Sequence, residues 1–260
     1  MIKSPAPFKA SNLNVRHGFF SRFGGVSTGR YAELNGGATT DDDPAAIKEN
    51  RRLMAQYFDV TDAKFLALKQ VHGREVFVVG DETPLWPLSS LPEADGLVTN
   101  VPNLVLTITT ADCAPVLFSS GDGKIIGAAH AGWRGAVNGI LEETMHQMRS
   151  LGATNIKAAI GPCIGPKSYE ISANMRDEVL EKHPKAGDFF KALKQERQFM
   201  FDLPGFCVQC LTQNGVDSVE NLALDTVSDD RFFSYRRSFL AGNSATGRQV
   251  SAIQLRNIAL

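Results

Sequence analysis

The chain has 260 residues, of which 43% are apolar and 21% are charged, and this composition excludes a disordered or fibrous protein. A chain of this length buries about 70–75% of the surface that it exposes when unfolded, so it needs no staples to hold a core. Its 27 Lys and Arg nearly balance its 28 Asp and Glu, which leaves a net charge of −1. Without a basic excess, a long nucleic acid is not an expected partner.

The N-terminal segment lacks the apolar stretch of a signal peptide, and no apolar run approaches the ~18–20 residues that span a membrane. We therefore expect a cytoplasmic protein that is not bound to a membrane, with its four cysteines present as reduced thiols. No repeat, low-complexity stretch or linker divides the chain, so we predict a single domain over residues 1–260. Residues 80–95, with three prolines, are the best candidate for a long loop.

Predicted strands are mixed with predicted helices along the chain, and helices lie between some of the strands. Nine short runs, most of them rich in β-branched or aromatic residues, predict strands at 16–21, 65–71, 75–79, 104–109, 116–119, 124–130, 156–160, 218–222 and 249–255. A helix is predicted to begin at Pro44, after Asp43 as its N-terminal cap. Two more helices are predicted over residues 136–150 and 204–214. This order favours an α/β fold, a single layered domain with a mixed β-sheet covered by helices.

Three segments each end a predicted strand with a residue that could bind a metal or act as a nucleophile. They are QVHG at 70–73, TTADCAP at 109–115 and AAHAGWRG at 128–135. Sites in α/β sheets gather at strand ends, and His72, Cys113 and His130 together suit Zn²⁺ with a fourth position open for water or substrate. The alternative is that each is an ordinary buried residue, because no local ligand pair such as HExxH is present.

Two segments contain arginines that could bind an anion. Gly132 and Gly135 flank Arg134 just before a predicted helix, whose N-terminus offers free N–H groups to an anion. Arg134 could add a bidentate contact to phosphate, although a tight turn with a surface arginine would have the same sequence. FFSYRR at 232–237 suits stacking and anion contacts, and an ordinary strand with an exposed edge would fit it equally.

The remaining cysteines give no second site. Cys207 and Cys210 form a CxxC without a second pair, inside a predicted helix, so we predict that both are core residues. The segment GPCIG at 161–165 lacks the second cysteine of the PCxxC pair in nucleobase deaminases, and HAG at 130–132 lacks the glutamate of their HxE. The chain therefore does not have that deaminase fold.

Taken together, these motifs resemble the YfiH family, the bacterial laccase-domain or polyphenol oxidase proteins, which are related to a human purine nucleoside enzyme. TADC-x-P and HAGWRG at this separation are the most specific of them, and TTD at 39–41 departs from the family, where relatives often carry a glycine before the acidic pair. The matching stretches span nearly the whole chain in order: HGFFSRFGGVS at 17–27, DDP at 42–44, ENR at 49–51, QVHG at 70–73, TADCAPVLF at 110–118, AAHAGWRG at 128–135, IGPCIG at 160–165, FFSYRR at 232–237 and TGR at 246–248.

The resemblance implies a metal bound by His72, Cys113 and His130, either zinc or copper, since such ligands suit both. It also implies purine nucleoside phosphorolysis, in which adenosine, inosine or methylthioadenosine reacts with phosphate to give the free base and a ribose 1-phosphate. Adenosine deamination is implied as a side activity. The expected partners are then a small-molecule nucleoside and phosphate, with no obligate protein partner.

The resemblance implies two further functions. One is the editing of wrongly loaded peptidoglycan precursors. The other is the phenol oxidation of the laccase label, which we do not expect. A multicopper oxidase needs about ten histidines, because each copper favours imidazole ligands, and this chain has five.

Phosphorolysis requires residues that hold orthophosphate while it attacks C1′ of the ribose. Arg134 and Arg22 are the first candidates for these contacts and Arg236 is the third. The predicted catalytic residues are Cys113, His130 and Arg134, with the metal acting as a Lewis acid or lowering the pKa of a bound water. No general acid stands out, and Asp112 could serve to orient a ligand.

Two other functions would use the same residues. Cys113 could be a nucleophile activated by His130, as in cysteine hydrolases, although a third ligand at His72 favours a metal. A zinc-stabilised protein that only binds a partner would need a closed site of four ligands, and the candidates number three.

Overall fold

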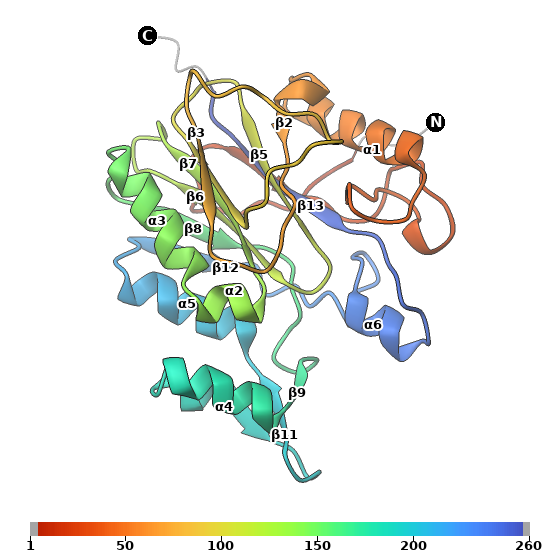
Figure 1. Ribbon diagram of the computed structural model, residues 1–260, viewed down its shortest axis with the longest axis vertical. Helices are drawn as coiled ribbons and strands as arrows, with labels where there is room; N and C mark the ends of the chain where they lie inside the picture. Colours follow the sequence, from red (N-terminus) through yellow and green to blue (C-terminus); the bar gives the residue numbers. More distant parts are fainter. Residues whose placement is uncertain (1–4, 257–260) are drawn as a thin grey trace.

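The computed structural model describes residues 5–256 and stacks two β-sheets between layers of helices (Figure 1). The larger sheet has the strand order β12-β8-β6-β7-β4-β3, and its pairs are antiparallel except for the pairs β3 with β4 and β8 with β12. This sheet confirms the predicted α/β class with a mixed sheet. Its strands are β3 (Val76–Val79), β4 (Gly96–Thr99), β6 (Ala114–Ser119), β7 (Ile126–Ala131), β8 (Lys157–Ile160) and β12 (Ser218–Asn221).

A second sheet packs on one face of the first, where the sequence predicted only one sheet. Successive side chains of a strand point to opposite faces, so alternate residues of each strand face the neighbouring sheet. Between the two sheets, Leu106 of the second sheet shares a core with Leu97 and Leu117 of the first. The second sheet has the order β1-β13-β5-β2, with β1 (Arg16–Phe19), β2 (Phe65–Leu66), β5 (Val105–Thr110) and β13 (Gln249–Gln254).

Helices cover the outer face of each sheet. On the larger sheet, Val116 and Phe118 of β6 share a core with the apolar residues of α3 (Ile140–Ser150) and α5 (Leu203–Gln213). On the smaller sheet, Val250 of β13 packs with Met54 and neighbouring residues of α1 (Pro44–Tyr57). The central strands β4, β6 and β7 of the larger sheet and β13 of the smaller one are therefore buried along their whole length.

The helix boundaries follow local signals, with one correction to the prediction. Asp43 caps α1 by accepting a hydrogen bond from the Ala45 N–H at 3.0 Å, as expected. The helix predicted over residues 136–150 is instead two helices, α2 (Trp133–Val137) and α3, because Gly139 has a φ of +91° that ends the first helix. The sequence placed a turn with Gly132 and Gly135 before the predicted helix. In the structure Gly135 lies in α2, with Gly132 as the N-terminal cap of this helix.

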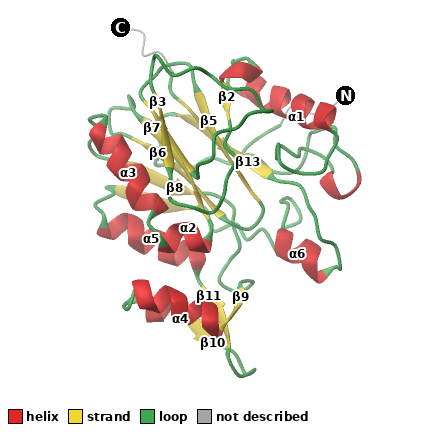
Figure 2. Ribbon diagram, viewed as in Figure 1, coloured by secondary structure: helices red, strands yellow, loops and turns green. Residues whose placement is uncertain are grey.

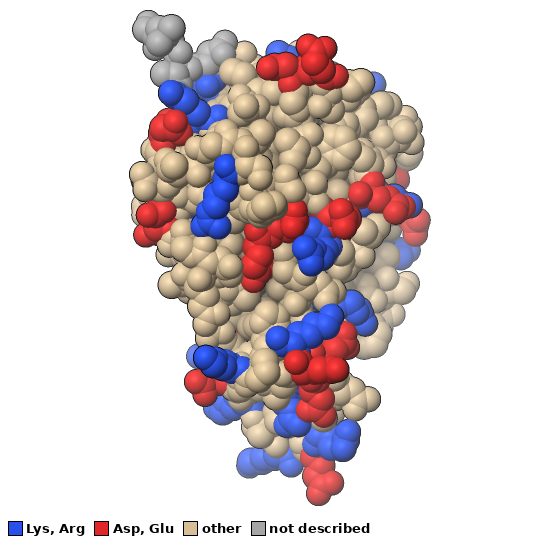
Figure 3. All heavy atoms as spheres, turned by 60° about the vertical axis from the view of Figure 1, so that its left-hand side comes forward, with Lys and Arg blue, Asp and Glu red and all other residues tan. Residues whose placement is uncertain are grey.

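The sequence missed a small unit at one end of the molecule, which Figure 2 shows below the two large sheets. It consists of α4 (Ala173–Lys182) and a sheet of order β10-β11-β9, built from β9 (Glu170–Ser172), β10 (Phe190–Ala192) and β11 (Gln198–Phe201). On the face in Figure 3, Lys and Arg alternate with Asp and Glu at this end, so the charges there are mixed. These strands have three or four residues and mix polar with apolar side chains, so no run of β-branched residues marks them in the sequence.

FFSYRR contains a helix, and the alternative of an exposed edge strand was wrong. Residues 235–240 form α6 (Tyr235–Leu240), which begins after Ser234, whose side chain accepts a hydrogen bond from the Arg237 N–H at 3.0 Å. Three short 3-10 helices complete the structure: η1 (Gly29–Tyr31), η2 (Asp62–Lys64) and η3 (Ala186–Phe189).

Several other expectations concern features outside the sheets. Residues 80–95 contain no helix or strand, as predicted for a loop. All four cysteines are free thiols, and Cys207 and Cys210 are buried in α5 as predicted. Within residues 5–256, every helix is too short or too polar to cross a membrane.

Candidate metal and substrate site

The structure brings together the three residues that the sequence proposed as metal ligands. His72 lies in the loop after β2, Cys113 in the turn between β5 and β6, and His130 on β7. Their ligand atoms all lie within 4.8 Å of one another. The Cys113 Sγ is 3.7 Å from the His72 Nε2, and the two imidazole rings are 4.7 Å apart at their centroids.

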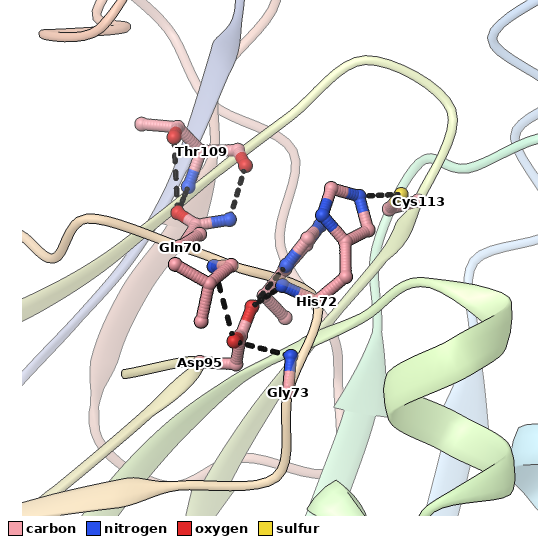
Figure 4. A network of polar contacts seen from close by, with 8 residues as sticks. Gln70, His72, Gly73, Asp95, Thr109 and Cys113 are labelled. Carbon is pink, nitrogen blue, oxygen red and sulfur yellow. Dashed lines mark hydrogen bonds and ion pairs between the residues drawn. The ribbon is translucent and has the colours of Figure 1, made fainter. Parts of the chain in front are cut away.

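Asp95, which the sequence did not suggest, holds two of these residues in place (Figure 4). Its buried carboxylate accepts hydrogen bonds from the N–H groups of Val71, His72 and Gly73 at 2.7–3.1 Å. The same carboxylate lies 2.8 Å from Nδ1 of His130, so the Nε2 of that ring is the nitrogen left for a metal or a substrate. One side chain therefore fixes both histidines.

The loop that carries His72 has a second attachment. The Gln70 amide donates to the carbonyl of Thr109 at 2.8 Å and accepts from the Thr109 N–H at 2.9 Å (Figure 4). His72 itself has a φ of +61°, and Asp112, the residue before Cys113, has a φ of +92°. Such left-handed backbone in non-glycine residues is strained and clusters at functional sites.

Gly132 leaves room beside the cluster. A Cβ atom at this position would lie 2.8 Å from Cδ2 of His72 and 3.1 Å from Sγ of Cys113. Only glycine leaves that space free, so the backbone after β7 can approach the two side chains closely.

The cluster favours a charged thiolate. Burial raises the pKa of the Cys113 thiol, but the charge of His130 and the hydrogen bonds from His130 and His72 outweigh it and lower that pKa to about 6. For His130, burial lowers the pKa, while the charge of Cys113 and the hydrogen bond to Asp95 outweigh burial and raise it to about 9. A thiolate is the form of cysteine that binds metals and attacks electrophiles.

The donor set fits a metal with one open position. A thiolate and two imidazoles are ligands for zinc or copper, and two such donors on a tetrahedral zinc lie about 3.5 Å apart, close to the observed 3.7 Å between Cys113 and His72. The bond from His130 to Asp95 is the carboxylate–histidine arrangement that supports metal ligands. Within residues 5–256, these three residues are the one group of His, Cys, Asp and Glu placed to hold a metal.

The cluster opens into a cavity of about 1030 Å³. Its walls carry three cationic side chains, Lys167, Arg236 and Arg248, together with Trp133 and Tyr169. Burial raises the pKa of the Tyr169 hydroxyl, helped by the charge of Cys113, so this hydroxyl stays protonated at neutral pH.

Of the three predicted anion-binding arginines, only Arg236 lines the cavity. Arg22 donates to the carbonyl of Ala32 at 2.7 Å and lies over the ring of Phe233, outside the cavity wall. Arg134 is exposed and stacks on Trp133, so it lies next to a wall residue without lining the cavity itself.

Arg248 is a wall residue that the sequence analysis missed as an anion contact. Its guanidinium donates to the carbonyls of Thr246 and Gly247 at 2.8 and 3.0 Å, and it pairs with no carboxylate of residues 5–256. Burial lowers the pKa of Arg248, and the nearby charge of Cys113 counteracts this. The only signal in the sequence was its place in the TGR stretch.

Asp112 has a different role from the one expected. Its carboxylate accepts hydrogen bonds from the Thr226 hydroxyl at 2.7 Å and from the backbone N–H of Arg236 at 2.6 Å. Asp112 therefore fixes the first turn of α6 beside Cys113, and Asp95 orients the ligand histidine instead.

Comparison with known proteins assigns the chain to a family. Residues 16–256 match the family model described as multi-copper polyphenol oxidoreductase laccase. The chain belongs to this family. A relative by sequence is a Rickettsia conorii protein named purine nucleoside phosphorylase RC0672, which is 38% identical to this chain over 88% of this chain and 91% of its own length.

Two further relatives agree with the YfiH resemblance. The Escherichia coli protein named purine nucleoside phosphorylase YfiH is 35% identical over 90% of this chain and 91% of its own length. The crystal structure of Bacillus licheniformis hypothetical protein YfiH matches with a TM-score of 0.85 at 28% identity, covering 97% of each chain. The family's fold is therefore the mixed α/β architecture described above.

Proposed function

We propose that the chain is a metal-dependent purine nucleoside phosphorylase that acts on adenosine, inosine or methylthioadenosine. The products are the free base and a ribose 1-phosphate. The observation that carries the proposal is that the His72, Cys113 and His130 cluster lines the same cavity as the guanidinium groups of Arg236 and Arg248, neither of which pairs with a carboxylate of residues 5–256. The names of the sequence relatives support the same activity.

Arg236 and Arg248 are the groups proposed to hold phosphate. A planar guanidinium matches the oxygens of phosphate and offsets the loss of its hydration. In the reaction, a phosphate oxygen forms a bond to C1′ of the ribose while the bond from C1′ to the purine nitrogen breaks, and the purine leaves with that electron pair. Arg134, beside Trp133 at the edge of the wall, is kept as a more distant anion contact, and Arg22 is not assigned a role.

His72, Cys113 and His130 would hold the metal, which we propose to be zinc, with copper as the second choice for the same ligands. When bound, it supplies a Lewis acid in the cavity. Asp95 holds the His130 ring so that Nε2 faces the cluster. The protonated Tyr169 hydroxyl can donate a hydrogen bond to the substrate. Adenosine deamination is proposed as a side activity of the same cavity.

The test is product analysis of adenosine incubated with the purified, metal-analysed protein, with and without phosphate, alongside His72→Ala. Adenine that forms only with phosphate, and is lost in the variant, would establish the phosphorylase. Inosine formed without phosphate would establish deamination as the main reaction. Adenosine left intact in both conditions would overturn the nucleoside proposal.

A cysteine hydrolase is the second candidate, and one observation favours it. The thiol of Cys113 interacts with His130, and His130 is hydrogen-bonded to the carboxylate of Asp95. Nucleophile, base and orienting carboxylate are connected in the same way in hydrolase triads. Amide substrates, including cell-wall precursors, would then be attacked by the thiolate. Mass spectrometry would detect an acyl group on Cys113 in the wild type and not in Cys113→Ser, and chelators would leave such an activity intact.

A further inference from the structure

One wall of the substrate cavity is apolar and open to solvent. Three of its residues lie on α6, where Tyr235, Phe239 and Leu240 are 46%, 63% and 73% exposed. Leu193 and Met200, from the small unit that carries β10 and β11, line the same cavity. Large apolar side chains this exposed in one group mark a binding surface more often than a bare surface.

The position of α6 relative to the cluster is fixed by hydrogen bonds. The backbone N–H of Arg236 donates to Asp112 at 2.6 Å, one residue before Cys113. The Arg236 guanidinium donates to the carbonyl of Glu170 at 2.9 Å and thereby ties α6 to β9. The rings of Tyr235 and Phe239 stack at 6.4 Å between centroids, so these two side chains form one continuous part of the wall.

The cavity has more room than a nucleoside and a phosphate ion fill. Its volume of about 1030 Å³ lies just above the range of ~300–1,000 Å³ that is typical of sites for drug-sized ligands. The metal-ligating and cationic residues account for only part of its lining, and the apolar wall accounts for much of the rest. A ribose and a purine alone offer no flexible apolar group to cover that wall.

We propose that the apolar wall binds an alkyl substituent of the nucleoside, so that the enzyme prefers alkylated purine nucleosides to unsubstituted ones. This inference rests on the proposed function and specifies its substrate class. The alkyl group could extend from the 5′ carbon of the ribose or from the purine amino group, and both place the same chemistry on the wall. Each methylene that becomes buried is expected to raise kcat/KM about two- to fourfold.

The experiment measures phosphate-dependent release of the base from two series of nucleosides. The first contains adenosine and its 5′-methylthio, 5′-butylthio and 5′-hexylthio derivatives, and the second contains N6-methyl-, N6-butyl- and N6-hexyladenosine. We expect kcat/KM to rise with chain length by at least tenfold from methyl to hexyl in one series. The series that rises identifies the end of the nucleoside that meets α6.

Phe239→Ser and Leu240→Ser test whether α6 causes this preference. Each is expected to reduce the hexyl-to-methyl ratio of kcat/KM by at least threefold. Phe23→Ser is the matched control, because Phe23 is 46% exposed and lies outside the cavity wall, and it should keep the wild-type ratio. The inference would be overturned if kcat/KM were independent of chain length in both series. It would also be overturned if kcat/KM rose with chain length equally in the wild type and in both α6 variants.

Failure of the proposed function gives a different result. In that case adenosine itself yields no adenine with phosphate. Isothermal titration of the same nucleosides still tests the wall, because affinity should rise with chain length in the wild type and should rise at least threefold less from methyl to hexyl in Phe239→Ser. Affinity that is independent of chain length would overturn the inference there too.

Discussion

His130 and His17 are both almost fully buried, at 3% and 4% exposed, and their surroundings give them opposite chemistry. His130 lies between the carboxylate of Asp95 and the thiol of Cys113, and its pKa rises to about 9 although burial lowers it. Burial lowers the pKa of His17, and its partners, the N–H of Ala10 and the carbonyl of Val15, carry no charge. Burial alone therefore does not distinguish a candidate ligand histidine from a structural one; here the charge of the partners does.

The two histidines also connect different parts of the chain. His17 fixes the backbone of residues 10–15, within seven residues of itself. His130 and its carboxylate partner are 35 residues apart, and that carboxylate also binds the backbone of residues 71–73. His17 therefore stabilises a local turn, whereas His130 and Asp95 together join three separate segments of the chain.

The largest expected effect comes from removing the thiolate beside His130. Cys113→Ser should lower metal affinity and phosphate-dependent adenine release by more than about a hundredfold, because loss of a residue that only supports a ligand already costs 10–100-fold. Metal analysis after dialysis and product chromatography measure both. Cys210→Ala, at a thiol buried in α5 away from the cavity, should retain metal and activity. Full metal content in Cys113→Ser would show that the thiol is not a ligand.

Asp95→Asn should have a smaller effect on the same site. The amide of asparagine has one oxygen in place of two, so it cannot accept from the three backbone N–H groups and from His130 together. We expect metal affinity to fall about 10–100-fold, measured by competition with a chromophoric chelator.

Asp122→Asn is the control for this experiment, because Asp122 accepts hydrogen bonds in a surface turn away from the cluster. Equal metal affinity in Asp95→Asn and wild type would remove Asp95 from the site.

The smallest effect concerns His17 and depends on pH. Its pKa is lowered in the folded state, so the unfolded chain binds more protons once the pH falls below about 6.5. The contribution of neutral His17 to stability is therefore complete above that pH and declines as the pH falls toward the folded pKa. We expect the urea concentration at the midpoint of unfolding to decrease as the pH is lowered from 7.5 to 5.5.

His17→Leu should lower the free energy of unfolding by about 1–3 kcal/mol at pH 7.5, because the buried N–H of Ala10 loses its acceptor. The same variant should also show a smaller decrease of the urea midpoint when the pH is lowered from 7.5 to 5.5. His146→Gln, at an exposed position of α3, should leave the decline unchanged. A decline that is the same in His17→Leu as in the wild type would assign it to other groups.

Much of the fold could be predicted from the sequence, because most strands of the two large sheets are rich in β-branched or aromatic residues. Each of the nine predicted strands overlaps an observed strand, and Asp43-Pro44 correctly marks the start of α1. β4 was missed because it starts at a glycine after an irregular loop, and β9, β10 and β11 because they are short and carry polar residues. The stacking of two sheets depends on packing between distant strands, which no local pattern reports.

The candidate ligands could also be predicted, but their supporting residues could not. His72, Cys113 and His130 each stand in a recognisable motif at the end of a predicted strand. Asp95 stands at the end of a loop and meets His130 only through the fold, and the left-handed backbone of His72 has no signature in its sequence. Arg248 lines the cavity and Arg22 does not, and the sequence did not predict this difference. The position of a guanidinium depends on tertiary structure.

The most direct test of the central claim is a titration of the metal-free protein with Co²⁺, followed by absorption spectroscopy. Cobalt takes the same nitrogen and sulfur ligands as zinc and reports a bound thiolate through a charge-transfer band. We predict a band that saturates at one equivalent of metal, that is absent in Cys113→Ser and that is weakened in Asp95→Asn. Saturation only at several equivalents, or an equal band in Cys113→Ser, would contradict a single metal held by His72, Cys113 and His130.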